Sequence, residues 1–137
     1  MILDTDVIVA AIRSSTGASA ELVRRVLRGD LLIEASVALV LEYEAVSTRQ
    51  AHLAAGGLSE AEALVVIDAL AALARPIEIH FRWRPQLRDA DDEMVLEAAI
   101  NAQDRTIVTF NVRDFAMAVE KFGITVETPA RFLRRLK

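Results

Sequence analysis

Met1-Ile2-Leu3-Asp4-Thr5-Asp6 is the stretch that decides the fold of this 137-residue chain. Its three apolar residues predict a short buried strand, and two carboxylates follow directly where the strand ends. Apolar residues resume from Val7 to Ile12, and Ser14-Ser15-Thr16-Gly17 then indicates a loop. Asp4 therefore stands at the carboxyl end of a strand.

Strand and helix patterns alternate along the rest of the chain. Ser19, Ser36 and Ser59 are the expected helix N-caps, and Glu62 completes a capping box with Ser59. Strands are expected at residues 1–3, 31–33, 76–81, 106–109 and 124–126, and helices at 19–28, 37–54, 58–74, 89–100, 116–122 and from 129 onward. This alternation predicts a three-layer α/β/α fold with a central parallel sheet, in a single domain.

Composition narrows the class of protein. The chain is 53% apolar and has no cysteine, which excludes disulfides, thiolate metal sites and cysteine nucleophiles and fits a reducing compartment. Met1 leads directly into the first strand, and no apolar stretch is long enough to cross a bilayer, so we expect a cytoplasmic protein without a membrane span. Apolar residues surround the helix 58–74 almost completely, which favours self-association as a homodimer.

The charge distribution favours a local nucleic-acid site over bulk coating. The formal net charge of −4 argues against coating, because that mode of binding needs a basic face. Arginines nevertheless recur in groups within residues 24–28, 82–88 and 131–135. Such groups around an acidic pocket suit a phosphodiester substrate, although solvated helix faces are the commoner explanation.

Arg88-Asp89-Ala90-Asp91-Asp92-Glu93 places four carboxylates within five residues, directly before an apolar helix pattern. A helix N-terminus explains one or two of them, with Asp89 as N-cap, because each such contact contributes roughly 0.3–1 kcal/mol. Further acids repel one another by similar amounts unless a divalent cation offsets the charge. Asp92 lies three and seven positions before Val95 and Ala99, so it extends the inward stripe of the helix.

Several acids are expected to meet at one edge of the sheet. Parallel sheets bind ligands beyond the carboxyl ends of their strands, where Asp4, Asp114 and the acidic helix start converge. Glu42 joins them if its helix packs beside the first strand. Such a cluster suits a hard cation with oxygen ligands, such as Mg²⁺ or Mn²⁺.

Five segments in fixed order carry a family resemblance: Ile2-Leu3-Asp4-Thr5-Asp6-Val7, Leu41-Glu42-Tyr43-Glu44, Arg88-Asp89-Ala90-Asp91-Asp92, Val108-Thr109-Phe110-Asn111-Val112-Arg113-Asp114-Phe115 and Thr128-Pro129-Ala130-Arg131-Phe132-Leu133. Together they resemble the PIN-domain ribonucleases, in particular the toxins of prokaryotic toxin–antitoxin pairs. The resemblance runs over the whole chain and implies one PIN-like nuclease domain spanning residues 1–137. It also implies an RNA substrate and an antitoxin protein as partners.

The resemblance further implies a Mg²⁺- or Mn²⁺-dependent endoribonuclease whose acidic quartet is Asp4, Glu42, Asp92 and Asp114. Asp4 and Asp92 are the expected direct metal ligands, while Glu42 and Asp114 bind a second ion or hold waters. The sequence departs from the family at three positions. Asp6 stands where the family usually has Asn, Ala90 replaces a frequent Pro, and Asn111 stands where some members have Asp. The first and third departures leave open whether Asp6 is an extra ligand and whether Asn111 or Asp114 is the fourth functional group. Asp6, Asn111 and Asp89 are the possible auxiliary residues.

Two other functions remain open. One is a PIN-fold binding module that has lost its metal, against which the presence of all four acids argues. The other is a haloacid-dehalogenase-like phosphatase with Asp4 as nucleophile, which needs a lysine near the pocket. Lys121 and Lys137, the lysines of the chain, do not directly follow a strand.

Three further features have ordinary structural explanations. His52 and His80, the histidines of the chain, lie far in sequence from every acidic motif and are expected at the surface or in a strand. The segment Phe81-Arg82-Trp83-Arg84 interleaves aromatic and basic side chains. It is suited to stacking an RNA base, but packing against the core is the favoured interpretation.

Overall fold

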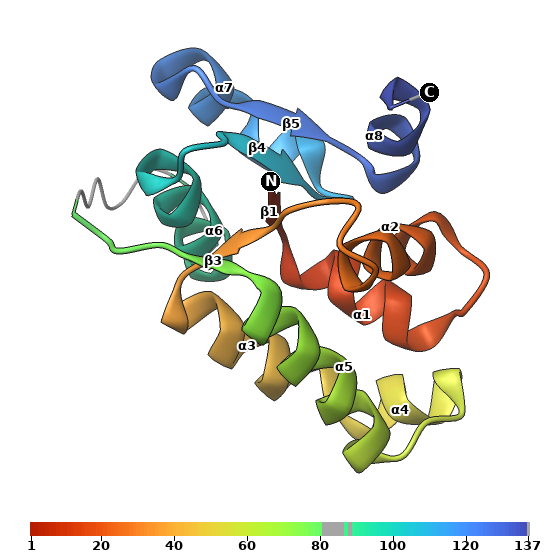
Figure 1. The fold of residues 1–137 in the computed structure, drawn as a ribbon. Coiled ribbons are helices and arrows are strands. Elements are labelled where there is room, and N and C mark those ends of the chain that lie inside the picture. Colours follow the sequence, from red (N-terminus) through yellow and green to blue (C-terminus); the bar gives the residue numbers. More distant parts are fainter. Residues whose placement is uncertain (81–86, 88, 137) are drawn as a thin grey trace.

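A parallel sheet of three strands lies at the centre of the fold (Figure 1). In the computed structural model, which describes residues 1–80, 87 and 89–136, β1 (Ile2–Leu3) pairs with β4 (Thr106–Val108). On its other side β4 pairs with β5 (Thr125–Glu127). The register aligns Leu3 with Val108, so β1 and β4 end side by side. The residues that follow the two strands therefore meet at the same edge.

A second, two-stranded parallel sheet lies beside β1. β2 (Glu34–Ala35) pairs with β3 (Arg75–Pro76). The backbone N–H of Glu34 also donates a hydrogen bond of 2.9 Å to the carbonyl of Met1, just before β1. The strands thus follow one another in space in the order β3, β2, β1, β4, β5.

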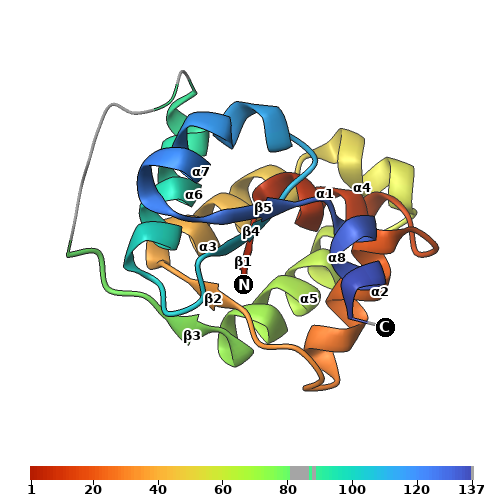
Figure 2. The ribbon, with the colours of Figure 1, turned by 90° about the horizontal axis from the view of Figure 1, so that it is seen from above.

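Helices cover both sides of the strands. α6 packs against β1 and β4, while α2 and α8 pack together on the opposite side (Figures 1 and 2). The three-layer α/β/α fold with a central parallel sheet is therefore confirmed. The helical elements are α1 (Thr5–Arg13), α2 (Ala18–Leu27), α3 (Val37–Ser47), α4 (Gln50–Gly56), α5 (Glu60–Leu73), α6 (Ala90–Asn101), the 3₁₀ helix η1 (Val112–Phe115), α7 (Ala116–Phe122) and α8 (Pro129–Arg135).

Side-chain caps explain where several helices begin. The Ser36 hydroxyl accepts a hydrogen bond from the Leu39 N–H, and Ser59 and Glu62 form the predicted capping box at the start of α5. The prediction for Ser19 is wrong, because α2 begins at Ala18 after Gly17. Ser19 is the second residue of the helix rather than the residue before it, and its buried hydroxyl has no hydrogen-bond partner among the described residues.

The predicted helix 37–54 is in fact two helices. α3 ends at Ser47, and the Thr48 hydroxyl donates a 2.7 Å hydrogen bond to the carbonyl of Glu44. Arg49 is extended, with φ −63° and ψ 137°, and α4 starts after it. Side-chain bonds of this kind compete with helical backbone bonds. The break turns α4 towards α1.

Two predicted strands differ from the observed ones. β2 lies at residues 34–35 rather than 31–33, and β3 is limited to 75–76 rather than 76–81. Beyond β3 the N–H of Ile77 still bonds the carbonyl of Ala35, whereas the N–H of His80 bonds the side-chain oxygen of Asn101. The segment Phe81–Arg84, with its proposed packing or base-stacking role, lies outside the described residues.

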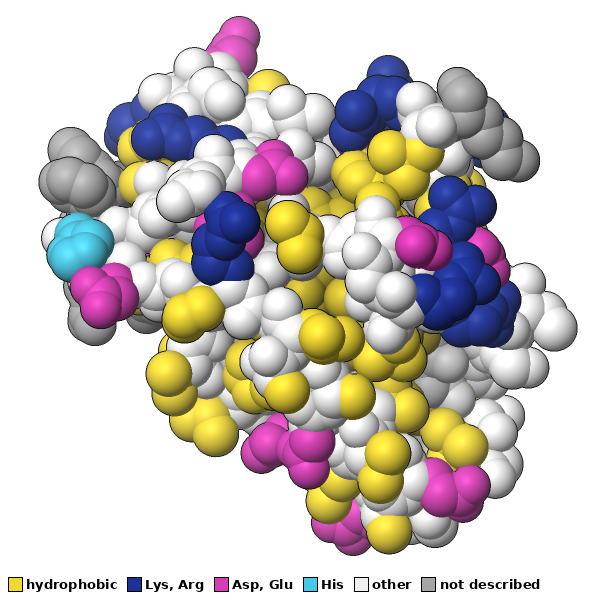
Figure 3. Space-filling view, in the orientation of Figure 1, with side chains coloured by type: hydrophobic (Ala, Val, Ile, Leu, Met, Phe, Trp, Pro, Cys, Tyr) yellow, Lys and Arg dark blue, Asp and Glu magenta, His cyan; other side chains and the backbone are white. Residues whose placement is uncertain are grey.

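Apolar side chains remain exposed on α3 and α5. The helices pack against each other, yet Val37 and Leu41 on α3 are 77% and 58% exposed, and Val65 on α5 is 69% exposed. Figure 3 shows hydrophobic side chains gathered over these helices in the lower part of the molecule. Among the described residues, α2 and α3 cover one side of the apolar helix α5, and Val65 lies on a side that they leave exposed. In the described part of the chain, no helix is long and apolar enough to span a membrane.

Candidate active site

Asp4 stands directly beyond the end of β1. Its backbone N–H donates to the carbonyl of Val108 on β4, and its side chain is buried. The Thr109 hydroxyl, just beyond β4, donates a 2.8 Å hydrogen bond to Asp4 Oδ2. Burial raises the pKa of Asp4, and the bond from Thr109 acts in the opposite direction. Two neighbouring strand ends thus fix this carboxylate.

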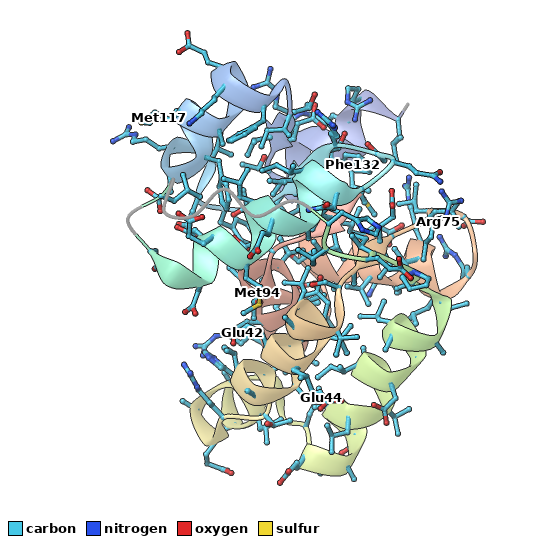
Figure 4. All side chains as sticks on the ribbon, turned by 90° about the vertical axis from the view of Figure 1, so that its left-hand side faces the viewer. Glu42, Glu44, Arg75, Met94, Met117 and Phe132 are labelled. Carbon is cyan, nitrogen blue, oxygen red and sulfur yellow. The ribbon has the colours of Figure 1, made fainter. Side chains whose placement is uncertain are left out.

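Glu42 reaches the same region from α3. Its neighbour Tyr43 is buried and donates a hydrogen bond of 2.5 Å from its hydroxyl to the carbonyl of Leu3, immediately before Asp4. This bond ties α3 to the end of β1 and meets the condition for Glu42 to join the cluster. Figure 4 shows Glu42 near Met94 of α6, whereas Glu44 extends from α3 in another direction. Burial raises the pKa of Glu42, as does the negative charge of Asp91.

The start of α6 separates the acidic residues by role. The Asp89 side chain accepts a 2.9 Å hydrogen bond from the Asp91 N–H and is the N-cap, as predicted. Asp91 is exposed, while Asp92 is only 8% exposed, in agreement with its spacing from the apolar stripe. Glu93 is also buried and accepts a hydrogen bond from the N–H of Leu87. One acid therefore caps the helix, and another faces the strand ends.

Two adjoining cavities share Asp89 and Asp92. The first, of about 320 Å³, contains Asp4 and Glu42, and the second, of about 460 Å³, contains Asp114. The first is also lined by Thr5, Asp6, Val9, Val46, Arg49, His52, Asp91 and Asn111, and the second by Leu87, Arg113, Ala116 and Met117. Asp92 thus lies between the other three acids of the predicted quartet.

Electrostatics also connect Asp92 with the other acids. Burial, followed by the negative charges of Asp4, Asp89 and Asp114, raises the pKa of Asp92 to about 6. These charges come from different segments of the chain. Carboxylates that lie this close together repel one another unless a cation or a proton offsets their charge.

Asp6 links the end of β1 to the segment after β4. Its Oδ2 accepts hydrogen bonds from the Phe110 N–H at 3.0 Å, from Asn111 Nδ2 at 3.2 Å and from the Thr109 hydroxyl at 3.3 Å. Its Oδ1 is buried and has no hydrogen-bond partner in the described part of the chain. Burial and the charge of Asp4 raise the pKa of Asp6 to about 7.

Sequence reasoning missed three residues of this site. Thr109 was only part of a predicted strand, although its position at a strand end was a usable signal. Arg49 and His52 reach the cavity because α4 turns back towards α1, so their distance in sequence from the acidic motifs was misleading. His80 is exposed, with its ring 3.4 Å from Glu78.

The side chains offer oxygen donors, but not an assembled metal site. In the segments that the structure describes, no three Asp, Glu, His or Cys side chains are arranged so that they would hold a metal ion. The buried, unpartnered oxygen of Asp6 and the crowding around Asp92 nevertheless leave negative charge that a cation would offset. A set of carboxylates without thiolates fits a hard divalent cation such as Mg²⁺ or Mn²⁺.

Comparison with known proteins identifies one family. A family model described as PIN domain matches residues 1–113. The match contains Asp4, Glu42 and Asp92 and ends immediately before Asp114. No curated protein and no solved structure gives a significant match.

Proposed function

Because this chain belongs to the PIN-domain family, whose members are generally nucleases, we propose that it is an endoribonuclease that hydrolyses RNA phosphodiester bonds with Mg²⁺ or Mn²⁺. The observation that supports this most directly is the position of Asp92. It is buried between two cavities, and its pKa responds to Asp4 and Asp114 from separate segments. We propose that residues 1–137 act together as one nuclease domain.

Asp4 and Asp92 are the proposed direct ligands of the metal, and Glu42 and Asp114 bind a second ion or hold waters. A divalent cation held there would supply positive charge to the phosphate and would lower the pKa of a coordinated water. Asp4 enters this arrangement already oriented by the hydrogen bond from Thr109. Side-chain rotation has to bring the carboxylates into coordination distance, since the described side chains do not form a metal site as they stand.

Asp6, Asn111 and Asp89 are proposed to position other parts of the site and to take no direct part in the reaction. Asp6 holds the backbone N–H of Phe110 and the amide of Asn111, and so fixes the segment that leads to Asp114. We propose that Asp114 is the fourth carboxylate and that Asn111 orients this segment through Asp6. Asp89 caps α6 and adds negative charge beside Asp92.

The comparison of Glu42 with Glu44 tests this function. Both are half-buried acids on α3, but only Glu42 lines the carboxylate cavity. We expect E42Q to lose Mg²⁺-dependent cleavage of total RNA by at least about tenfold, which corresponds to about 1.4 kcal/mol, while E44Q keeps the wild-type rate. Equal rates for both variants and the wild type would exclude Glu42 from the site.

A metal-free binding module is the second candidate, and the lack of an assembled metal site among the described residues favours it. Isothermal titration with Mn²⁺ separates the two functions. A nuclease gives heat of binding that disappears in D92N, and a binding module gives none in either protein. The phosphatase alternative lacks its lysine in the described residues, since Lys121 lies over the ring of Phe122 and Lys137 is outside them.

We also propose that the protein is the cytoplasmic toxin of a toxin–antitoxin pair and forms a homodimer. The exposed apolar side chains on α3 and α5 support a protein partner, because such surfaces are usually covered (Figure 3). Expression that arrests growth, and arrest that D92N abolishes, would support the toxin role. Analytical ultracentrifugation tests the dimer, and a monomer at micromolar concentration would contradict it.

A further inference from the structure

The acidic cavity has one basic side, which we name the basic flank and define as Arg13, Arg49 and His52. Arg49 and His52 line the same cavity as Asp4 and Glu42. Arg13 stands at the end of α1 and contacts His52 across the α1–α4 packing. The flank brings one guanidinium group and an imidazole to a cavity otherwise dominated by carboxylates, and the second guanidinium group, that of Arg13, contacts the imidazole.

Arg13 fixes the hydrogen-bonding state of His52. Its Nη1 lies 2.9 Å from His52 Nδ1. A guanidinium group can only donate, so Nδ1 is the acceptor and the ring proton is on Nε2. Because His52 also lines the cavity, this tautomer offers the Nε2 hydrogen as a donor on that side of the site.

The Arg49 guanidinium group carries a positive charge beside the acidic cavity. Its side chain is exposed and makes no hydrogen bond or ion pair with any residue that the structure describes. Its positive charge nonetheless lowers the pKa of Glu42, against the effects of burial and of Asp91. An exposed guanidinium beside a cavity is suited to bidentate contact with a phosphate.

We propose that the basic flank is a phosphate-binding subsite for the RNA backbone, next to the phosphate that is cleaved. Arg49 binds the phosphate oxygens, His52 donates to them through Nε2, and Arg13 is a positioning residue that acts through His52. This inference rests on the proposed function. A basic flank explains how a chain with a net charge of −4 binds a polyanion beside a carboxylate-lined cavity.

RNA binding in EDTA tests the flank without cleavage. The probe is a fluorescein-labelled single-stranded RNA of mixed sequence, and its fluorescence anisotropy is followed across a range of salt concentrations. R49Q should bind several-fold more weakly, and the slope of log affinity against log salt should decrease in magnitude by about 0.7, as expected for one lost phosphate contact.

Arg28 provides the matched control. It is 58% exposed, ends α2 and pairs with Asp30 at 3.2 Å. R28Q should therefore keep the wild-type affinity and slope. An unchanged slope in R49Q, an equal change in R28Q, or no measurable RNA binding by the wild type would each overturn the proposal.

The role of Arg13 has a spectroscopic test. Long-range ¹H–¹⁵N spectra above the ordinary histidine pKa of about 6.5 should show His52 protonated on Nε2 only, with H80Q used for assignment. R13Q should give a mixture of tautomers and weaker RNA binding. An unchanged tautomer or unchanged binding would contradict the positioning role.

Failure of this inference is distinguishable from failure of the proposed function. If R49Q shows the reduced salt slope but the wild type does not cleave RNA with Mg²⁺ or Mn²⁺, the nuclease function is wrong and the subsite stands. If the wild type cleaves and R49Q binds like the wild type, the subsite is wrong and the nuclease function stands.

Discussion

The Thr109 hydroxyl offers a sensitive test of how the carboxylates are held. Thr109 is fully buried, and its hydroxyl donates to Asp4 Oδ2 at 2.8 Å while it accepts from the Asn111 N–H at 3.0 Å. T109V removes both bonds, together with the longer one to Asp6 Oδ2 at 3.3 Å, and keeps a similar shape. Because the bond to Asp4 involves a carboxylate, we expect its loss to lower the free energy of unfolding by about 1.5–3 kcal/mol.

The sign of the pH dependence distinguishes this effect from a simple packing defect. The hydroxyl stabilises the charged form of Asp4, so T109V should raise the pKa of Asp4 further above its already raised value. The loss of stability should consequently be larger at about pH 8 than at about pH 4, because raising the pH favours the ionised form of Asp4 that the hydroxyl stabilises.

Urea unfolding at both pH values measures this difference, and T109S is the control. T109S keeps the hydroxyl and loses one methyl group, which costs about 0.8 kcal/mol at either pH. A T109V effect below about 0.5 kcal/mol, or one equal at both pH values, would refute the proposed role of the hydroxyl.

Three further predictions concern stability. Asp6 and Asp92 have pKa values of about 7 and about 6, raised mainly by burial. The free energy of unfolding in EDTA should therefore decrease as the pH rises from about 4 to about 8, and Mn²⁺ should make that decrease smaller. Urea unfolding with and without Mn²⁺ measures both effects. G56A should cost about 1–3 kcal/mol, because its added methyl collides with the carbonyl oxygen of Ile12, and thermal unfolding measures it. S59A should cost about 1 kcal/mol through loss of the capping box, with S59T, which retains the hydroxyl, as control.

Local signals in the sequence predicted the parts of the site that depend on one element. The spacing of Asp92 from Val95 and Ala99 determined which side of the helix it occupies, and its burial follows from that alone. Asp89 as N-cap is equally local, because the cap bonds the N–H of a residue two positions later. Strand ends predicted the place of Asp4, since the carboxyl ends of parallel strands share one edge.

The parts that depend on contacts between elements were not predictable in this way. The break at Arg49 is set by a Thr48 side-chain bond and by the close packing of Gly56 on α1, and neither has a distinct pattern in the sequence. His52 enters the cavity only because of that break. The short strands β2 and β3 were misplaced because a two-residue strand has too little alternation to fix its register.

The most direct test of the carboxylate site is cleavage of RNA by purified wild-type protein and D92N, each in Mg²⁺, in Mn²⁺ and in EDTA. Circular dichroism first establishes that D92N is folded. The proposed mechanism predicts cleavage by the wild type with either metal, none in EDTA, and a loss of at least about a hundredfold in D92N. Cleavage that persists in EDTA, or a folded D92N as active as the wild type, would contradict a metal-dependent nuclease site built around Asp92.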